Sequence, residues 1–419
     1  FELRAAQPAE ARLVFSNADP TSDPTELRVP ARAAIFAENP AGGPPLIFET
    51  DQAIDFLPRP LGSAQVFEGI RFRDVTAQNS PDEQAYWPLG RVPQPGHALM
   101  LGFDPIPPVE GTPIDTAPFP PQLRLRVFLP PQPRETTRQH ESIDSLVGSE
   151  IPAPPPGVRL VWEYRPSSRE PWRRLNQIRD DSAAFTREGD IVLEGPARIE
   201  PTVEGKQTSS ESAESADPEA EPVPAVPRYW LRARLDRGVY PAGQAPLIDF
   251  VAINVVNARN LSTVENEVLG ESNGQPDQVY LFERRPVVLD DSLRIEVAPS
   301  EDPSATETWE RRDDFLNSRP SDPHYVINST RGEIQFGDGG RGRIPPAAAL
   351  ILAAQYRHGG GSLGNVAAGT IISPLGGLGN ITVTNPRAAV GGRDEESVDA
   401  LRDRAPALIR SRNRAVTED

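Results

Sequence analysis

A glycine-rich segment, Gly337-Asp-Gly-Gly-Arg-Gly342, has the spacing with which dinucleotide-binding loops approach a pyrophosphate. That chemistry needs a helix that begins at the last glycine and directs its N-terminus toward the phosphates. Here Arg343-Ile-Pro-Pro346 follows, and two prolines without an amphipathic run argue against such a helix. We therefore interpret the segment as a glycine turn after a strand at residues 333–336.

The spacing of histidine and serine also fails to support a zinc protease or a serine hydrolase. His140-Glu141 lacks the second histidine of the zinc motif, because Asp144 stands four residues after His140. Ser362 follows a histidine, but the order Gly360-Gly361-Ser362-Leu363-Gly364 is not that of a nucleophile elbow, and no helix signal follows it.

Acidic and aromatic residues suggest two further kinds of binding site. Asp313, Asp314 and Asp338 could offer oxygen ligands to calcium, but no series of ligands at regular short spacing is present. The tryptophans could form a sugar platform, although most stand in strand-like patterns, so we expect core or half-buried positions. They are Trp87, Trp162, Trp172, Trp230 and Trp309. We predict no catalytic residue, cofactor or metal, and we do not expect an enzyme.

The composition excludes several classes of protein. Without cysteine the 419 residues form no disulfide, thiolate zinc site or cysteine nucleophile, and four histidines make a histidine-rich metal site unexpected. A net charge of −17 argues against a nucleic-acid-binding protein and favours basic partners. No run of 18 apolar residues is present, so we expect no membrane insertion.

Short apolar runs separated by turn signals predict a mainly β, multidomain chain that is α+β overall. Leu123, Leu125 and Val127 alternate with residues of the opposite face in one such run. Many short strands at this spacing are typical of an immunoglobulin-like β-sandwich. Predicted strands cover residues 11–15, 66–72, 123–129, 158–164, 191–193, 229–235, 247–256, 279–283, 293–298, 325–328, 333–336, 348–357 and 380–384.

We divide the chain into four segments. Residues 1–200 form a β-sandwich-rich, immunoglobulin-like region of one or two subdomains. Residues 201–227 form an acidic linker or insertion, with too few large apolar side chains to fold alone. Residues 228–390 form a second β-rich domain. Residues 391–419 begin a helical or α+β interaction region, which we expect to continue beyond Asp419.

One helix is predicted near the end of the chain, over residues 394–412. Apolar residues from Val398 to Leu408 recur at helical spacing, and Asp394 with the two glutamates after it would stand at the positive N-terminus. Pro406 would kink or divide the helix. Five arginines give its end a positive charge, suited to a solvated face or an acidic subunit contact: Arg402, Arg404, Arg410, Arg412 and Arg414.

Several segments of the second half form an ordered set. Residues 264–278 read VENEVLGESNGQPDQ, residues 332–339 read GEIQFGDG, and residues 356–371 read YRHGGGSLGNVAAGTI. Shorter segments stand at 314–318, 324–325, 384–386, 391–396 and 414–419. In this order they resemble the baseplate-J-like family, the baseplate assembly proteins of phage tails and contractile injection systems. Parts of residues 161–189 resemble the β-sandwich that precedes this region in larger members.

The resemblance implies a structural subunit of a baseplate wedge. Copies of the chain would join a second wedge protein in a ring around the hub and its spike, and would contact sheath or tube components. The ring would link contact with the target to sheath contraction. The protein would be assembled in the bacterial cytoplasm and would end as part of the injection particle.

We expect the glycine-rich motifs, the joint around residues 384–396 and the arginine-rich end to form assembly contacts. Glycines let two backbones approach closely, and arginines can pair with an acidic subunit. The predicted interface residues are Tyr356, Arg357, Gly359, Gly360, Gly361, Gly364, Asn365, Asn385, Pro386, Gly391, Gly392, Asp394, Glu395, Arg402, Arg404, Arg410 and Arg412.

Two other functions stay open at this point. A secreted carbohydrate-binding or adhesive β-sandwich protein would account for the tryptophans, the prolines and the acidic surface, but not for the ordered motifs. A polysaccharide-cleaving enzyme carried on a tail is the other. Glycan binding by a monomeric chain would favour the first, and turnover of a polymer the second.

Overall fold

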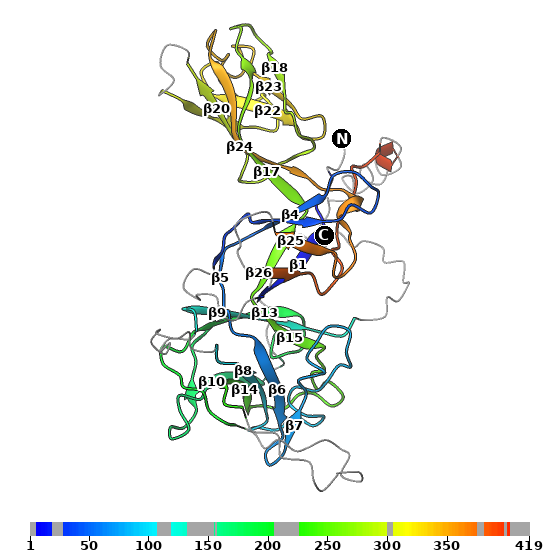
Figure 1. Cartoon of the computed structure of the whole chain (residues 1–419). Helices are drawn as coiled ribbons and strands as arrows, with labels where there is room; N and C mark the ends of the chain where they lie inside the picture. The colour runs from blue at the N-terminus through cyan, green and yellow to red at the C-terminus, as the bar shows by residue number, and fades with distance from the viewer. Residues whose placement is uncertain are drawn as a thin grey trace, which may run out of the picture.

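The computed structural model describes residues 6–18, 28–106, 119–131, 155, 157–204, 226–299, 305–374, 381–397 and 400–402. Strands dominate these residues and gather into three bodies, which follow one another along the molecule (Figure 1). Each body has its own buried apolar core. The prediction of a mainly β, multidomain chain is confirmed.

The first body, which we call the sandwich, consists of two sheets around one core. The six-stranded sheet has the order β11 (Arg173–Arg174), β10 (Arg159–Tyr164), β14 (Tyr229–Arg237), β8 (Ala98–Phe103), β6 (Leu61–Phe67) and β7 (Phe72–Asp74). The four-stranded sheet has the order β12 (Gln177–Asp180), β13 (Gly189–Glu194), β9 (Gln122–Phe128) and β15 (Phe250–Ile253).

The alternation of β14 shows why this sheet forms. Successive side chains of a strand point to opposite faces. Leu231, Ala233 and Leu235 therefore enter the core, while Arg232 and Arg234 lie on the other face and donate to the carboxylate of Glu163 on β10. Cross-strand pairs of this kind fix the register of neighbouring strands.

The second body, the middle sheet, joins segments that lie far apart in the sequence. Its order is β25 (Ile371–Pro374), β3 (Ala34–Ala37), β4 (Leu46–Thr50), β16 (Val255–Arg259), β1 (Glu10–Asn17) and β26 (Ile381–Thr384). A separate pair consists of β2 (Arg28–Val29) and β5 (Ile54–Asp55). The predicted division followed the order of the sequence. The middle sheet instead combines strands from two of the predicted segments, residues 1–200 and residues 228–390.

The third body, the barrel, is one curled sheet. Its order is β17 (Leu261–Glu271), β24 (Leu350–Gly359), β20 (Arg294–Ala298), β21 (Glu307–Arg311), β22 (His324–Asn328), β23 (Glu333–Phe336) and β18 (Val279–Leu281), and β19 (Val287–Val288) also pairs with β24. β17 and β18 are the two ends of this order. The Tyr280 hydroxyl donates to the Glu271 carbonyl at 3.1 Å, so the sheet closes nearly into a ring.

Two predicted strands are interrupted. Residues 66–72, expected as one strand, form a hairpin in which Phe67 pairs with Phe72 and the turn includes Gly69 at φ 85°. Residues 247–256 break at Asn254, whose φ is 53°, and the chain passes there from the sandwich to the middle sheet. In both cases a left-handed residue reverses or redirects an otherwise apolar run.

The predicted helix over residues 394–412 begins later than expected. Residues 394–397 are not helical, and the helix described covers 400–402. The N–H of Ala400 donates to the Ser397 hydroxyl at 3.2 Å, so Ser397 and not Asp394 caps it. Most of the rest of this prediction, and most of the predicted linker at 201–227, lies outside the described residues.

Candidate functional site: the upper joint

One continuous stretch of chain links the middle sheet to the barrel. β16 ends at Arg259 and β17 begins at Leu261, so only Asn260 separates the two bodies (Figure 1). The Asn260 side-chain amide donates to the Ile47 carbonyl at 2.9 Å, and its backbone N–H donates to the Ala9 carbonyl at 2.9 Å. We call the region formed by Glu49, Asn260, Thr263, Arg357 and segments 359–365 and 391–394 the upper joint.

The returning strand β24 leaves the barrel through three consecutive glycines. Gly359 has φ 127°, and a Cβ there would stand 2.9 Å from the Asn260 carbonyl oxygen. The Gly360 N–H donates to that same oxygen at 3.1 Å, and the Gly361 N–H donates to the Gln7 carbonyl at 3.0 Å. Close approach of two backbones therefore requires glycine here.

A buried ionic cluster crosses the upper joint. Glu49 of β4 is 5% exposed and accepts hydrogen bonds from the Thr263 backbone N–H at 2.5 Å and the Thr263 hydroxyl at 2.7 Å. Arg357 of β24 lies 3.9 Å from the Glu49 carboxylate and 3.2 Å from that of Asp290. Because a buried charge needs partners, these contacts tie the middle sheet to two barrel strands.

A second set of hydrogen bonds holds segment 391–394 against the glycines. The Asn365 amide donates to the Gly392 carbonyl at 2.7 Å and accepts the Gly392 N–H at 2.8 Å. A Cβ on Gly392 would stand 2.4 Å from the Gly361 carbonyl oxygen, so this contact is also possible only because glycine has no side chain. Gly364 packs in the same way against Asn260 and Ala9.

Ser362 is hydrogen-bonded to Asp394 and is not arranged as a catalytic nucleophile. The Ser362 backbone N–H and hydroxyl each donate to the Asp394 carboxylate at 2.7 Å. The side-chain bond and then the backbone bond from Ser362 lower the pKa of Asp394. Both donors thus bind the carboxylate that was expected at a helix N-terminus.

Three of the predicted interface residues lie in cores. Tyr356 is fully buried in the barrel, and its hydroxyl donates to Glu267; burial raises the pKa of that hydroxyl. Asn385 is fully buried, donates to the Ala367 and Arg387 carbonyls at 2.9 Å and accepts the Ile371 N–H at 2.9 Å. Pro386 beside it is buried as well.

The structure brings eight of the 17 predicted interface residues together in the upper joint: Arg357, Gly359, Gly360, Gly361, Gly364, Asn365, Gly392 and Asp394. Gly391, Glu395 and Arg402 are exposed. Arg404, Arg410 and Arg412 lie outside the described residues. The role of the whole set in subunit contacts stays a prediction.

Sequence analysis missed a second joint, between the middle sheet and the sandwich. We define the lower joint by Asp249, Phe250, Asn254 and Arg387. The Arg387 guanidinium pairs with the buried Asp249 carboxylate and lies over the Phe250 ring, 5.7 Å from its centroid. The Asn254 side chain accepts the Leu57 N–H at 2.9 Å and donates to the Leu57 carbonyl at 2.8 Å. No local motif marks these residues, because the partners are distant in sequence.

Asp338, which first suggested chemistry, and a serine–histidine pair that the structure brings together both take structural positions. The Asp338 carboxylate accepts the N–H groups of Gly340 and Arg341 at 2.8 and 2.6 Å, which closes the glycine turn that we predicted. Ser318 and His324 form a hydrogen bond of 2.9 Å between the hydroxyl and Nδ1, but both are at least nine-tenths buried. Nε2 of His324 lies 3.7 Å from Glu310, beyond hydrogen-bond distance.

The tryptophans lie where the strand patterns predicted. Trp162, Trp230 and Trp309 are each at most 3% exposed, while Trp87 and Trp172 are half-buried. Arg232 covers the Trp172 ring at 4.1 Å. Within the described part of the chain, no three His, Asp or Glu side chains are grouped so that they could hold a metal ion. None of the helices described there is long and apolar enough to cross a membrane.

Comparisons with known proteins find similarity among solved structures. No family model matches the sequence, and no curated protein matches it. A chain of the type VI secretion system TssK-TssF-TssG baseplate subcomplex, determined by cryo-electron microscopy, aligns with 97% of this chain and 70% of its own length. The identity is 12% and the TM-score is 0.47, values that assign neither a family nor a role.

Proposed function

We propose that this chain is a structural, non-enzymatic subunit of the baseplate wedge in a phage-tail-like contractile injection system. The observation that carries the proposal is the convergence of motifs that resemble the baseplate-J-like family. Residues 356–365 and 391–394 are separated in sequence, yet they contact each other in the upper joint through Asn365 and Ser362. Their glycines serve backbone contact between two β bodies.

A mechanical role fits such a construction. Transmission of a displacement needs bodies that keep their shape and joints with defined contacts. The three cores supply the bodies, and the ionic cluster of Glu49 and Arg357 supplies one set of contacts. In the proposed ring, copies of this chain and a second wedge protein surround the hub, and triggering rearranges the interfaces that hold the extended state. Assembly takes place in the bacterial cytoplasm.

The test is affinity purification of the tagged full-length protein from its native cells, with mass spectrometry and electron microscopy of the eluate. We expect sheath, tube and hub proteins to co-elute with particles that carry a baseplate. A matched pair of variants sharpens the result: Gly392→Val, which blocks the upper joint, should reduce co-elution, whereas Gly243→Ala, in open space outside the predicted interface set, should not. Elution of the wild-type protein alone, from cells that produce sheath, would reject the proposal.

A further inference from the structure

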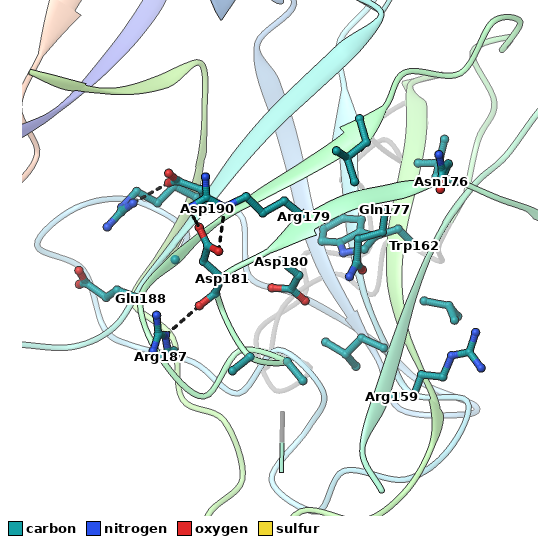
Figure 2. Close-up of a pocket in the computed structure, with 18 of the residues that line it drawn as sticks. Arg159, Trp162, Asn176, Gln177, Arg179, Asp180, Asp181, Arg187, Glu188 and Asp190 are labelled. Carbon is teal, nitrogen blue, oxygen red and sulfur yellow. Dashed lines mark hydrogen bonds and ion pairs between the residues drawn. The ribbon is translucent and has the colours of Figure 1, made fainter. Parts of the chain in front are cut away.

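The sandwich contains a pocket of about 1350 Å³ beside its contact with the middle sheet. One wall is β10, from Arg159 to Trp162, and the opposite wall is formed by residues 174–181 and the loop that leads to Asp190. Arg12 of β1 and Asn257 of β16 complete it from the middle sheet. Figure 2 shows acidic and basic side chains gathered at one end and Trp162 with Gln177 and Arg159 at the other.

Among the described residues, one buried acceptor that lines this pocket, Oδ1 of Asn257, has no donor, and three buried N–H donors have no acceptor. The donors are Nε1 of Trp162, Nε of Arg126 and Nε of Arg12. Trp162 is 1% exposed and Arg126 is 8% exposed. A buried donor without a partner costs free energy. A single unpaired donor is not evidence of a ligand, since Nε1 of Trp309 in the barrel core is also unpaired. Three unpaired donors around one pocket, however, favour a ligand that supplies hydrogen-bond acceptors.

The charge of the lining favours an anionic ligand. Six arginines face four carboxylates: Arg12, Arg126, Arg159, Arg174, Arg179 and Arg187 against Asp180, Asp181, Glu188 and Asp190. Asp190 pairs with Arg126 at 2.5 Å, and Asp181 pairs with Arg179 at 2.6 Å. Neither Arg159 nor Arg174 has an ion pair with another described residue, and both are exposed beside the pocket. On a chain with a net charge of −17, this is a local positive region.

The strand edges at the pocket favour a ligand in an extended conformation. β10 pairs with β14 along its whole length, but with β11 only at Glu163 and Tyr164. Among the described residues, β10 thus has no strand partner on the pocket side over residues 159–161. β12 likewise pairs only with β13 in the part of the chain that the structure describes. An unpaired strand edge can accept an added strand, and its main-chain hydrogen bonds then give affinity.

We infer that this pocket binds an extended acidic segment of a partner protein. The segment adds along the free edge of β10, places carboxylates against Arg159 and Arg174, and inserts one acceptor-bearing side chain toward Trp162 and Arg126. This inference is independent of the proposed function, because it rests on the lining residues alone.

Fluorescence anisotropy of the full-length protein tests it with three labelled nine-residue peptides, which alternate Thr with Glu, Gln or Lys. We expect the Thr-Glu peptide to bind at least tenfold more tightly than the Thr-Gln peptide, and the Thr-Lys peptide not to bind. Affinity should fall at high salt, because screening weakens exposed charge pairs. Equal binding of all three peptides, or no binding of the Thr-Glu peptide at millimolar concentration, overturns the inference.

Matched variants locate the site. The double change Arg159→Glu and Arg174→Glu should weaken Thr-Glu binding at least tenfold, whereas Arg198→Glu, an exposed sandwich arginine that does not line the pocket, should leave it unchanged. Trp162→Phe should weaken it severalfold, while Trp309→Phe, which removes the equivalent unpaired donor from the barrel, should not. If Trp162→Phe fails to fold, the arginine variants still show whether the peptide binds at this pocket. Binding of maltohexaose in place of the peptide also rejects an acidic partner.

Discussion

The upper and lower joints solve the same problem in different ways. The upper joint uses backbone contact at consecutive glycines, together with the buried cluster around Glu49. The lower joint has a left-handed Asn254 and the ion pair between Arg387 and Asp249. Backbone contact leaves a sequence signature, since only glycine fits. A side-chain pair 138 residues apart in sequence leaves none.

The largest effect is expected from Glu49→Ala. This change leaves the Thr263 hydroxyl and N–H without their acceptor and removes one partner of Arg357. Breaking a buried ionic cluster in this way costs about 3–5 kcal/mol. Hydrogen exchange with mass spectrometry should show loss of protection in β4 and β17. The control is Glu283→Ala, whose side chain is exposed, with an expected change within about 0.5 kcal/mol. Equal effects of Glu49→Ala and Glu283→Ala would show that the ionic cluster does not stabilise the upper joint.

Arg387→Ala should have a somewhat smaller effect, of about 1.5–3 kcal/mol, because Arg387 is itself partly exposed. The variant leaves the Asp249 carboxylate buried without its cation. Burial already raises the pKa of Asp249, and Arg387 opposes that shift. We expect protection to fall in β15 and β16 but not in the barrel. Loss of protection in β17 and β24 would mean that the two joints are not independent.

Two neighbouring glycines allow the cost of a steric clash to be compared with the cost of a left-handed backbone conformation. Gly392→Val forces a Cβ against the Gly361 carbonyl, whereas Gly391 has no atom within 4 Å of its Cβ position. We expect Gly392→Val to cost about 1–3 kcal/mol through overpacking. Gly391→Ala should cost about 1 kcal/mol, because its φ of 91° disfavours a side chain. Denaturant unfolding, monitored at the upper joint by hydrogen exchange, compares them; a reversed order would show that backbone contact does not define this joint.

The smallest effect concerns pH. Burial, aided by the charge of Arg284, lowers the pKa of His358 from 6.5, so the unfolded chain binds its proton more readily than the folded one. The stability linked to His358 is therefore fully present above pH 6.5 and is lost as the pH falls toward the lowered value. NMR titration of His358 should give a pKa below 6.5. His358→Gln should flatten the acid side of the barrel's stability profile, and an unchanged slope would contradict the assignment.

Much of the fold could be predicted because most strands carry local patterns. The alternation in β9 and the apolar runs in β14 and β24 predicted the positions of these strands within a few residues. β17 was missed, although it is the longest of the strands described, because residues 261–271 are largely polar and only partly buried. Its strand character comes from pairing with β24 and not from its own residues. The predicted start of the helix at Asp394 was wrong: residues 394–397 are not helical, and the Asp394 carboxylate accepts the Ser362 hydroxyl instead.

The sequence by itself determined that the chain is mainly β, that its tryptophans lie in or near cores, and that the glycines of residues 356–364 allow two backbones to approach closely. These properties depend on alternation and on the missing side chain of glycine, which are local. Only the tertiary structure decided that β1, β16 and β26 form one sheet. It also decided that Glu49 meets Arg357, and that three donors with no acceptor among the described residues line one pocket. Contacts of that kind depend on residues hundreds of positions apart, and no local pattern encodes which of many similar charges will meet.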